Sequence, residues 1–279
     1  MTNPLRILVF GAHPDDCEFK CAGSAARWSK AGHVVRFVSV TDGRNGHHQI
    51  EPDRLVTIRS KEAAAAAGVL GIESEVLPFP DGALEPNLEL RREIIRIERE
   101  FRPDVIMTHR PNDYHPDHRY TSQVVQDSAY MVTVPHVLPG IPALRRNPAI
   151  FYLSDHFQRP YPFTPDAIVP IDDVLDAKID ALACHESQVF EWIPYIKGGN
   201  EVPDEATERR EWLADWVSGE GRHLVSRFPV TIRTALDMKS GARVEGIEAF
   251  EACEYGSLLS PDDFRRLFGH APLPRQSSV

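Results

Sequence analysis

The sequence lacks long apolar runs and has few cysteines. No apolar stretch in the 279 residues approaches the ~20 that a membrane-spanning helix needs, and the chain does not open with the basic and apolar regions of a signal peptide. The cysteines are Cys17, Cys21, Cys184 and Cys253, too few for a disulfide scaffold in a chain of this size. We therefore expect reduced cysteines and a soluble, cytoplasmic protein.

Positive charge is also scarce. The 31 Lys and Arg residues against 41 Asp and Glu residues give a formal net charge of -10. This balance argues against sequence-independent binding to nucleic acid or to an anionic membrane, and it favours neutral or cationic small molecules as ligands. Residues 11–14, Gly-Ala-His-Pro, follow the first predicted strand and do not form a glycine-rich phosphate loop. A non-catalytic nucleotide-binding module is therefore the weaker interpretation.

Strand and helix patterns alternate along the chain. We expect strands at residues 6–10, 34–40, 75–79, 105–108 and 149–153, and helices at 19–30, 54–69, 88–101, 120–131, 172–183 and 201–227, with a short last helix after Ser260. The alternation predicts a Rossmann-like α/β fold, in which a doubly wound, mostly parallel sheet forms a single domain. We place this domain at residues 1–268, with a proline-rich candidate lid at 135–170 and a disordered tail at 269–279.

Metal-capable side chains follow two of the predicted strands. His13, Asp15 and Asp16 come after the strand at 6–10, and a second polar cluster, which includes His115 and His118, comes after the strand at 105–108. The carboxyl ends of parallel strands form the ligand-binding crevice of an open α/β sheet. If the two strands are neighbours, His13, Asp16 and His118 supply two imidazoles and a carboxylate to one ion and leave a coordination position open.

An open coordination position indicates catalysis. We expect Zn²⁺, with another divalent ion such as Fe²⁺ as the alternative. Asp15 is adjacent to a predicted ligand, and two neighbouring carboxylates cannot easily share one role. We therefore predict that Asp15 is the general base that activates the attacking water.

The two clusters resemble the motifs of a known family. Residues 12–18, Ala-His-Pro-Asp-Asp-Cys-Glu, and residues 115–118, His-Pro-Asp-His, are similar to the AHPDDxE and HxDH motifs of the PIG-L (LmbE-like) N-deacetylases. Weaker matches are Thr-Asp-Gly at 41–43, Arg-Ser-Lys-Glu at 59–62 and His-Glu-Ser-Gln at 185–188, so the resemblance spans roughly residues 5–190. It implies a metal-dependent amide hydrolase that removes an N-acetyl group from a small molecule containing N-acetylglucosamine.

The resemblance also implies roles for single residues. It assigns the base to Asp15, and it assigns to His115 the stabilisation of the oxyanion or the protonation of the leaving amine. It implies that Arg59 contacts sugar hydroxyls or a phosphate of the substrate, and we expect Asp117 to orient an imidazole. Weaker candidates for substrate contacts are Asp42, His47 and His185, for which a turn, a loop and a helix-end packing role are the respective alternatives.

Three rival functions remain beside the deacetylase. The first is an amidase that acts on a related sugar-thiol conjugate. The second is a non-haem iron oxygenase, because two histidines and a carboxylate also form its facial triad. Its usual jelly-roll scaffold, however, does not alternate strands with helices. The third is the nucleotide-binding module considered above. The sequence leaves open whether the chain forms a homo-oligomer.

Overall fold

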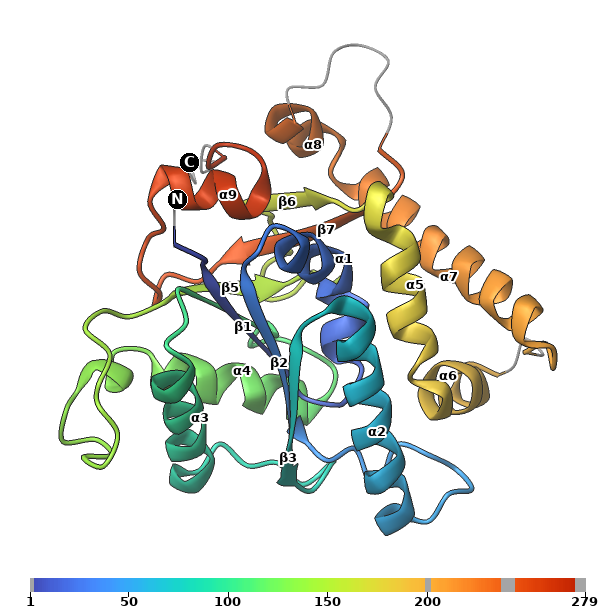
Figure 1. The fold of residues 1–279 in the computed structure, drawn as a ribbon, viewed down its shortest axis with the longest axis horizontal. Helices are drawn as coiled ribbons and strands as arrows, with labels where there is room; N and C mark the ends of the chain where they lie inside the picture. Colours follow the sequence, from blue (N-terminus) through green and yellow to red (C-terminus); the bar gives the residue numbers. More distant parts are fainter. Residues whose placement is uncertain (1–2, 199–201, 237–243, 274–279) are drawn as a thin grey trace.

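The centre of the computed structural model, which describes residues 3–198, 202–236 and 244–273, is a mixed β-sheet (Figure 1). Its strands are β1 (Arg6–Gly11), β2 (Val34–Thr41), β3 (Glu73–Phe79), β4 (Val105–Thr108), β5 (Ala149–Leu153), β6 (Ala167–Pro170) and β7 (Ile247–Ala252). They lie in the order β3-β2-β1-β4-β5-β7-β6. The first five strands in this order are parallel, and β7 is antiparallel to both of its neighbours. The predicted mostly parallel sheet is confirmed.

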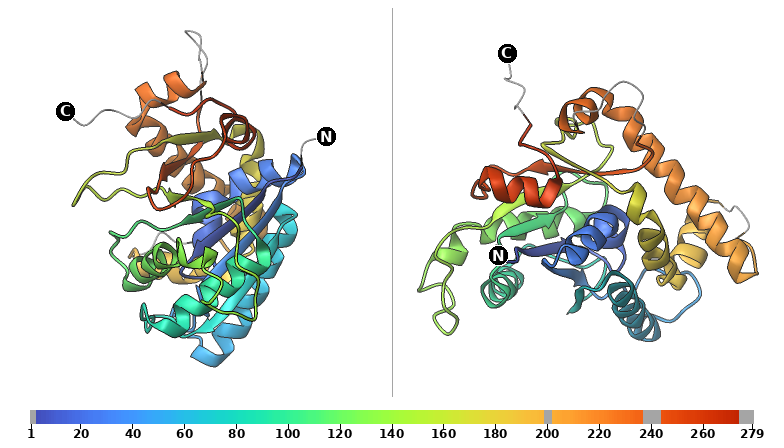
Figure 2. Two further views of the ribbon diagram at one scale, coloured as in Figure 1. Left: turned by 90° about the vertical axis from the view of Figure 1, so that its left-hand side faces the viewer. Right: turned by 45° about the horizontal axis from the view of Figure 1, so that its top comes forward.

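Helices cover both faces of the sheet (Figure 2). They are α1 (Asp16–Lys30), α2 (Pro52–Leu70), α3 (Leu88–Phe101), α4 (Pro116–Ser128), α5 (Leu175–Ala183), α6 (Ile193–Ile196), α7 (Ala206–Arg227), α8 (Pro229–Leu236) and α9 (Pro261–Phe268), with a π-helix at Ser187–Trp192 between α5 and α6. Because alternate residues of a strand face opposite sides, Ile7 and Val9 pack with α1, α2, α5 and α9, whereas Leu8 and Phe10 pack with α3 and α4. This arrangement confirms the doubly wound single domain.

The sequence patterns did not predict β6, β7 or α8. β6 is only four residues long and ends in a proline, and β7 (Ile-Glu-Ala-Phe-Glu-Ala) contains two glutamates and lacks a regular alternation. The four cysteines are free, as expected, and Cys17 and Cys21 lie on the buried face of α1 in the core. No helix among the described residues is both long and apolar enough to cross a membrane.

The proline-rich segment at 135–170 contains two strands of the sheet, β5 and β6. The loop between them is held by Arg110, whose Nη1 donates to Asp155 Oδ1 at 2.9 Å and whose Nη2 donates to the carbonyl oxygen of Tyr161 at 2.8 Å. Movement of this loop as a lid stays a prediction. In the expected tail, His270 Nε2 accepts a hydrogen bond from the backbone N–H of Ile168, so this residue is attached to β6, and residues 274–279 lie outside the described part of the chain.

Candidate metal centre and active site

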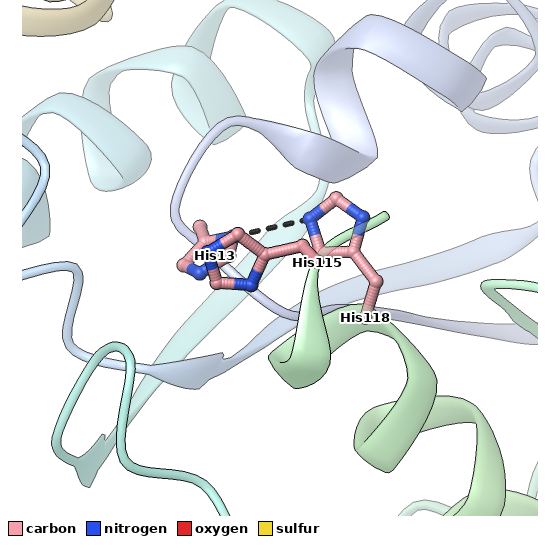
Figure 3. Close-up of side chains that lie close together, drawn as sticks. All are labelled: His13, His115 and His118. Atoms are coloured by element: carbon pink, nitrogen blue, oxygen red, sulfur yellow. Dashed lines mark hydrogen bonds between the residues drawn. The ribbon is translucent and has the colours of Figure 1, made fainter. Parts of the chain in front are cut away.

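The two predicted clusters meet at the carboxyl edge of the sheet. β1 and β4 are adjacent and parallel, with Val9 opposite Met107, so the segments that leave them run side by side. His13 lies in the turn after β1, and His115 and His118 lie at the start of α4. Figure 3 shows the three rings close together. The condition on which the shared site depended, that the two strands are parallel neighbours, is therefore met.

Three candidate ligand atoms form a nearly equilateral triangle. His13 Nδ1 lies 3.3 Å from Asp16 Oδ2, His118 Nε2 lies 3.3 Å from His13 Nδ1, and His118 Nε2 lies 3.4 Å from Asp16 Oδ2. Ligands about 2.0–2.1 Å from a tetrahedral Zn²⁺ are about 3.3–3.4 Å apart, so these atoms fit three corners of one coordination sphere. The donor set therefore suits a divalent ion with one open position.

Carboxylates face the remaining nitrogen of each histidine of the triangle. His13 Nε2 lies 3.1 Å from Asp81 Oδ1 and 3.4 Å from Asp117 Oδ2, and His118 Nδ1 lies 3.1 Å from Asp113 Oδ1. A metal-binding imidazole usually has such a partner at its second nitrogen, which fixes the ring and its tautomer. Asp81 and Asp113 were not predicted, although both follow strand ends. The arrangement points to His13 Nδ1 and His118 Nε2 as ligand atoms.

Other combinations of metal-capable groups overlap this triangle. Asp16, His109 and His118 form one such group, and His115 joins His13 and His118 in another. His109 is a poor ligand because its Nε2 already accepts a hydrogen bond from the backbone N–H of Ala12. Burial and the neighbouring His118 lower the pKa of His109 to about 4, and the two rings stack with centroids 4.1 Å apart. His109, which the sequence analysis did not assign, is thus a neutral support for His118.

Asp15 has a strained backbone at the first turn of α1. Its φ angle is 147°, a region that residues other than glycine rarely adopt, and such strain is typical of functional sites. Burial raises the pKa of Asp15 to about 6, against the opposing charge of Arg59. Arg59 Nη2 lies 3.3 Å from Asp15 Oδ2, whereas no residue of the described chain donates a hydrogen bond to Oδ1. Oδ1 is the oxygen left for a proton.

Arg59 is turned toward Asp15. Its side chain is 2% exposed, Nη2 donates to the carbonyl oxygen of Pro14 at 2.8 Å, and Nη1 donates to that of Gly43 at 3.1 Å. Both Nη groups therefore have protein acceptors, whereas Nε is buried without a partner among the described residues, and the predicted contact of Arg59 with the substrate stays a prediction. The carboxylate of Glu62, three residues further along α2, accepts hydrogen bonds from Ser187. Arg59 thus holds the turn that carries Asp15.

His115 caps α4 through its side chain. Nδ1 accepts the backbone N–H of Asp117 at 3.2 Å, and burial together with the charges of His13 and His118 lowers the pKa of His115. The neutral ring therefore carries its proton on Nε2, where it is available for donation. Asp117 accepts the backbone N–H of Gly82 at 2.6 Å and faces His13, so the imidazole that it orients is that of a predicted ligand.

The hydrogen-bond and ion-pair partners of the three weaker candidates all lie outside the triangle. Asp42 Oδ1 accepts the backbone N–H of Asp81 at 3.3 Å, and its carboxylate also binds Arg44. His47 Nε2 lies 2.9 Å from Glu191, and its Nδ1 accepts two backbone N–H groups of its own loop. His185 is buried, with Nε2 3.5 Å from Glu18 Oε1. The substrate contacts of all three remain predictions.

The site is a cluster of histidines and carboxylates at the carboxyl edge of a doubly wound sheet. This arrangement is typical of α/β enzymes that use a catalytic metal ion. Residues 8–129 match the model of the PIG-L family, described as GlcNAc-PI de-N-acetylase. This match confirms the resemblance to the PIG-L family found in the two motifs.

Individual relatives include deacetylases and a hydratase. The chain is 28% identical to the diacetylchitobiose deacetylase of Thermococcus kodakarensis over 69% of its length and 75% of that protein's. It is 22% identical to the 4-oxalmesaconate hydratase of Pseudomonas putida, over 68% of the chain and 76% of that protein. The solved N,N'-diacetylchitobiose deacetylase of Pyrococcus horikoshii superposes with a TM-score of 0.67 at 25% identity, covering 90% of this chain and 84% of that one.

Proposed function

We propose that the protein is a zinc-dependent N-deacetylase that releases acetate from a small molecule containing N-acetylglucosamine. The observation that carries this proposal is the triangle of His13 Nδ1, Asp16 Oδ2 and His118 Nε2, whose edges of 3.3–3.4 Å suit one tetrahedral ion. The strained Asp15 beside it and the deacetylases among the relatives support amide hydrolysis.

The chain's own residues divide the proton transfers. A bound Zn²⁺ would lower the pKa of a coordinated water to about 7 and polarise a carbonyl group. Asp15 accepts the proton of the attacking water on Oδ1 while Arg59 holds Oδ2. The N–H at His115 Nε2 donates to the carbonyl oxygen as negative charge develops on it. Asp15 then returns the proton to the amine nitrogen, so water and amide become acetic acid and amine, which ionise to acetate and an ammonium group.

The proton transfers at the amide do not identify the rest of the substrate. The same residues would serve an amidase of a sugar-thiol conjugate, because the group beyond the amide nitrogen takes no part in the proton transfers. An acetylated amino-sugar is the substrate we propose, in line with the deacetylases among the relatives. We also propose that the enzyme works in the cytoplasm without nucleic acid.

Release of acetate tests the proposal. Purified protein would be depleted of metal, reloaded with Zn²⁺ or Fe²⁺, and incubated with N-acetylglucosamine and diacetylchitobiose. We expect acetate and free amine in equal amounts, a loss of both products after metal removal, and their return after reloading with Zn²⁺. Return with Fe²⁺ alone would contradict the choice of zinc.

The hydratase among the relatives makes hydration the activity to test against deacetylation. Unsaturated carboxylic acids would be added to the panel, and loss of their ultraviolet absorbance would report addition of water to the double bond. Hydration without acetate from any amide would overturn the deacetylase and assign the site to the reaction of that relative. Asp15→Asn serves as the inactive control in both assays.

A further inference from the structure

Lys20 places an unpaired positive charge beside the candidate metal centre. It lies one turn after Asp16 on α1, on the same face of the helix, and helical side chains lean toward the helix N-terminus, here toward the metal ligands. Its side chain is half-buried. Lys20 forms no hydrogen bond or ion pair with any residue that the structure describes, whereas Arg59, Arg110 and Lys178 all have carboxylate partners.

The acidic residues around Lys20 are already engaged. Burial and the nearby charge of Lys178 lower the pKa of Lys20. The charges of Asp16, Asp155 and Asp113 act in the opposite direction, but none of the three approaches the ammonium group as an ion pair. Asp16 faces the histidines of the triangle, Asp113 lies 3.1 Å from His118 Nδ1, and Asp155 accepts hydrogen bonds from Arg110. A half-buried ammonium without a partner is costly, and an incoming anion would remove that cost.

An exposed aromatic side chain adjoins the same loops. Tyr114 is 73% exposed, and its ring centroid lies 5.6 Å from that of His118 and 6.4 Å from that of Phe157. The backbone N–H of Phe157 donates to Asp155, so this aromatic wall and the acids near Lys20 belong to one region between the ends of β4 and β5. A flat apolar surface beside the catalytic histidines suits the ring of a substrate.

We propose that Lys20, with Tyr114 as the adjoining wall, forms a subsite for the part of the substrate beyond the acetamido group and selects a carboxylate or phosphate there. This inference rests on the proposed deacetylase function and names its substrate class as anionic. The net charge of -10 indicated neutral or cationic ligands, but exposed charges beyond about 8–10 Å are screened at ordinary salt concentrations. The contact with Lys20 is local.

Paired substrates test the role of Lys20. N-acetylglucosamine 6-phosphate and N-acetylmuramic acid would each be compared with neutral N-acetylglucosamine, and the ratio of kcat/KM between the anionic and the neutral compound would be measured. We expect the wild type to prefer an anionic compound. Lys20→Met should reduce the ratio about 10- to 100-fold, the value of a hydrogen bond to a charged group, and Lys20→Arg should retain most of it.

The two anionic compounds separate a phosphate from a carboxylate preference. Lys30→Met, an exposed lysine at the other end of α1, is the matched control and should keep the wild-type ratio. An unchanged ratio in Lys20→Met, or a wild type that prefers the neutral compound, would overturn the subsite.

Binding measurements keep this test separate from the test of the deacetylase. Calorimetry with the same compounds needs no turnover. If no acetate forms but binding of an anionic compound weakens in Lys20→Met, the deacetylase function fails and the subsite stands. If wild type and Lys20→Met bind the anionic compounds equally, or neither binds them, the subsite fails whatever the enzyme hydrolyses.

Discussion

Replacement of Arg59 should reduce turnover while substrate binding remains. The buried guanidinium holds the carbonyl oxygens of Pro14 and Gly43 and faces Asp15 Oδ2, so its loss frees the turn that carries the proposed base. Hydrogen bonds to charged groups contribute about 1.5–3 kcal/mol each. If one such contribution is lost in aligning Asp15, kcat should fall about 10- to 150-fold.

Steady-state kinetics would separate this role from a substrate contact. In Arg59→Ala we expect kcat to fall with KM nearly constant, and we expect Arg59→Lys to recover only part of kcat because an ammonium group cannot reproduce the planar guanidinium fork. Thermal unfolding and metal content would show that each variant is folded and loaded. Arg54→Ala, an exposed position on α2, is the control. A large increase in KM with kcat intact would refute the positioning role and restore the substrate contact.

Three further predictions follow from single residues. His118→Ala should lose the tightly bound metal that wild type and the exposed-site control His136→Ala keep, and elemental analysis that finds a full equivalent in His118→Ala would contradict the ligand set. Asp15→Asn should keep the metal and lose about 10²- to 10⁴-fold in kcat, so near-normal turnover would exclude Asp15 as the base. Burial raises the pKa of Glu98, which is 0% exposed, from 4.5 to about 8, so the folded state holds a proton that the unfolded chain releases above about pH 4.5. The stability from this proton is fully present below about pH 4.5 and is lost as the pH rises through about 8. Relative to Glu98→Gln, wild type should therefore lose about 2–3 kcal/mol of unfolding free energy between about pH 6 and pH 9. Parallel pH dependences in denaturant titrations would refute the buried proton.

Some elements of the fold could not be predicted from the local pattern. The apolar strands at the centre of the sheet are buried on both faces, and this shows directly in their composition. The strand β7 instead contains two glutamates and no regular alternation, and it pairs between β5 and β6 although about a hundred residues separate it from β5. Such pairing depends on contacts distant in the sequence, which periodicity does not report.

The sequence alone determined the alternating α/β fold, and its two motifs at strand ends pointed to His13, Asp16 and His118. That was possible because motif order and strand periodicity are local properties. Only the tertiary structure decided which side chains support them. Asp81 and Asp113 come from separate loops, and they meet the histidines only because parallel strands end at one edge of the sheet.

The orientation of Arg59 likewise depended on the tertiary structure. The motif resemblance implies that Arg59 donates to a substrate, and in the structure the backbone of two neighbouring loops also supplies acceptors for its Nη groups. Its Nη1 and Nη2 groups find acceptors within the protein, while its Nε has none among the described residues, and which acceptors lie within reach is settled only when distant segments pack together.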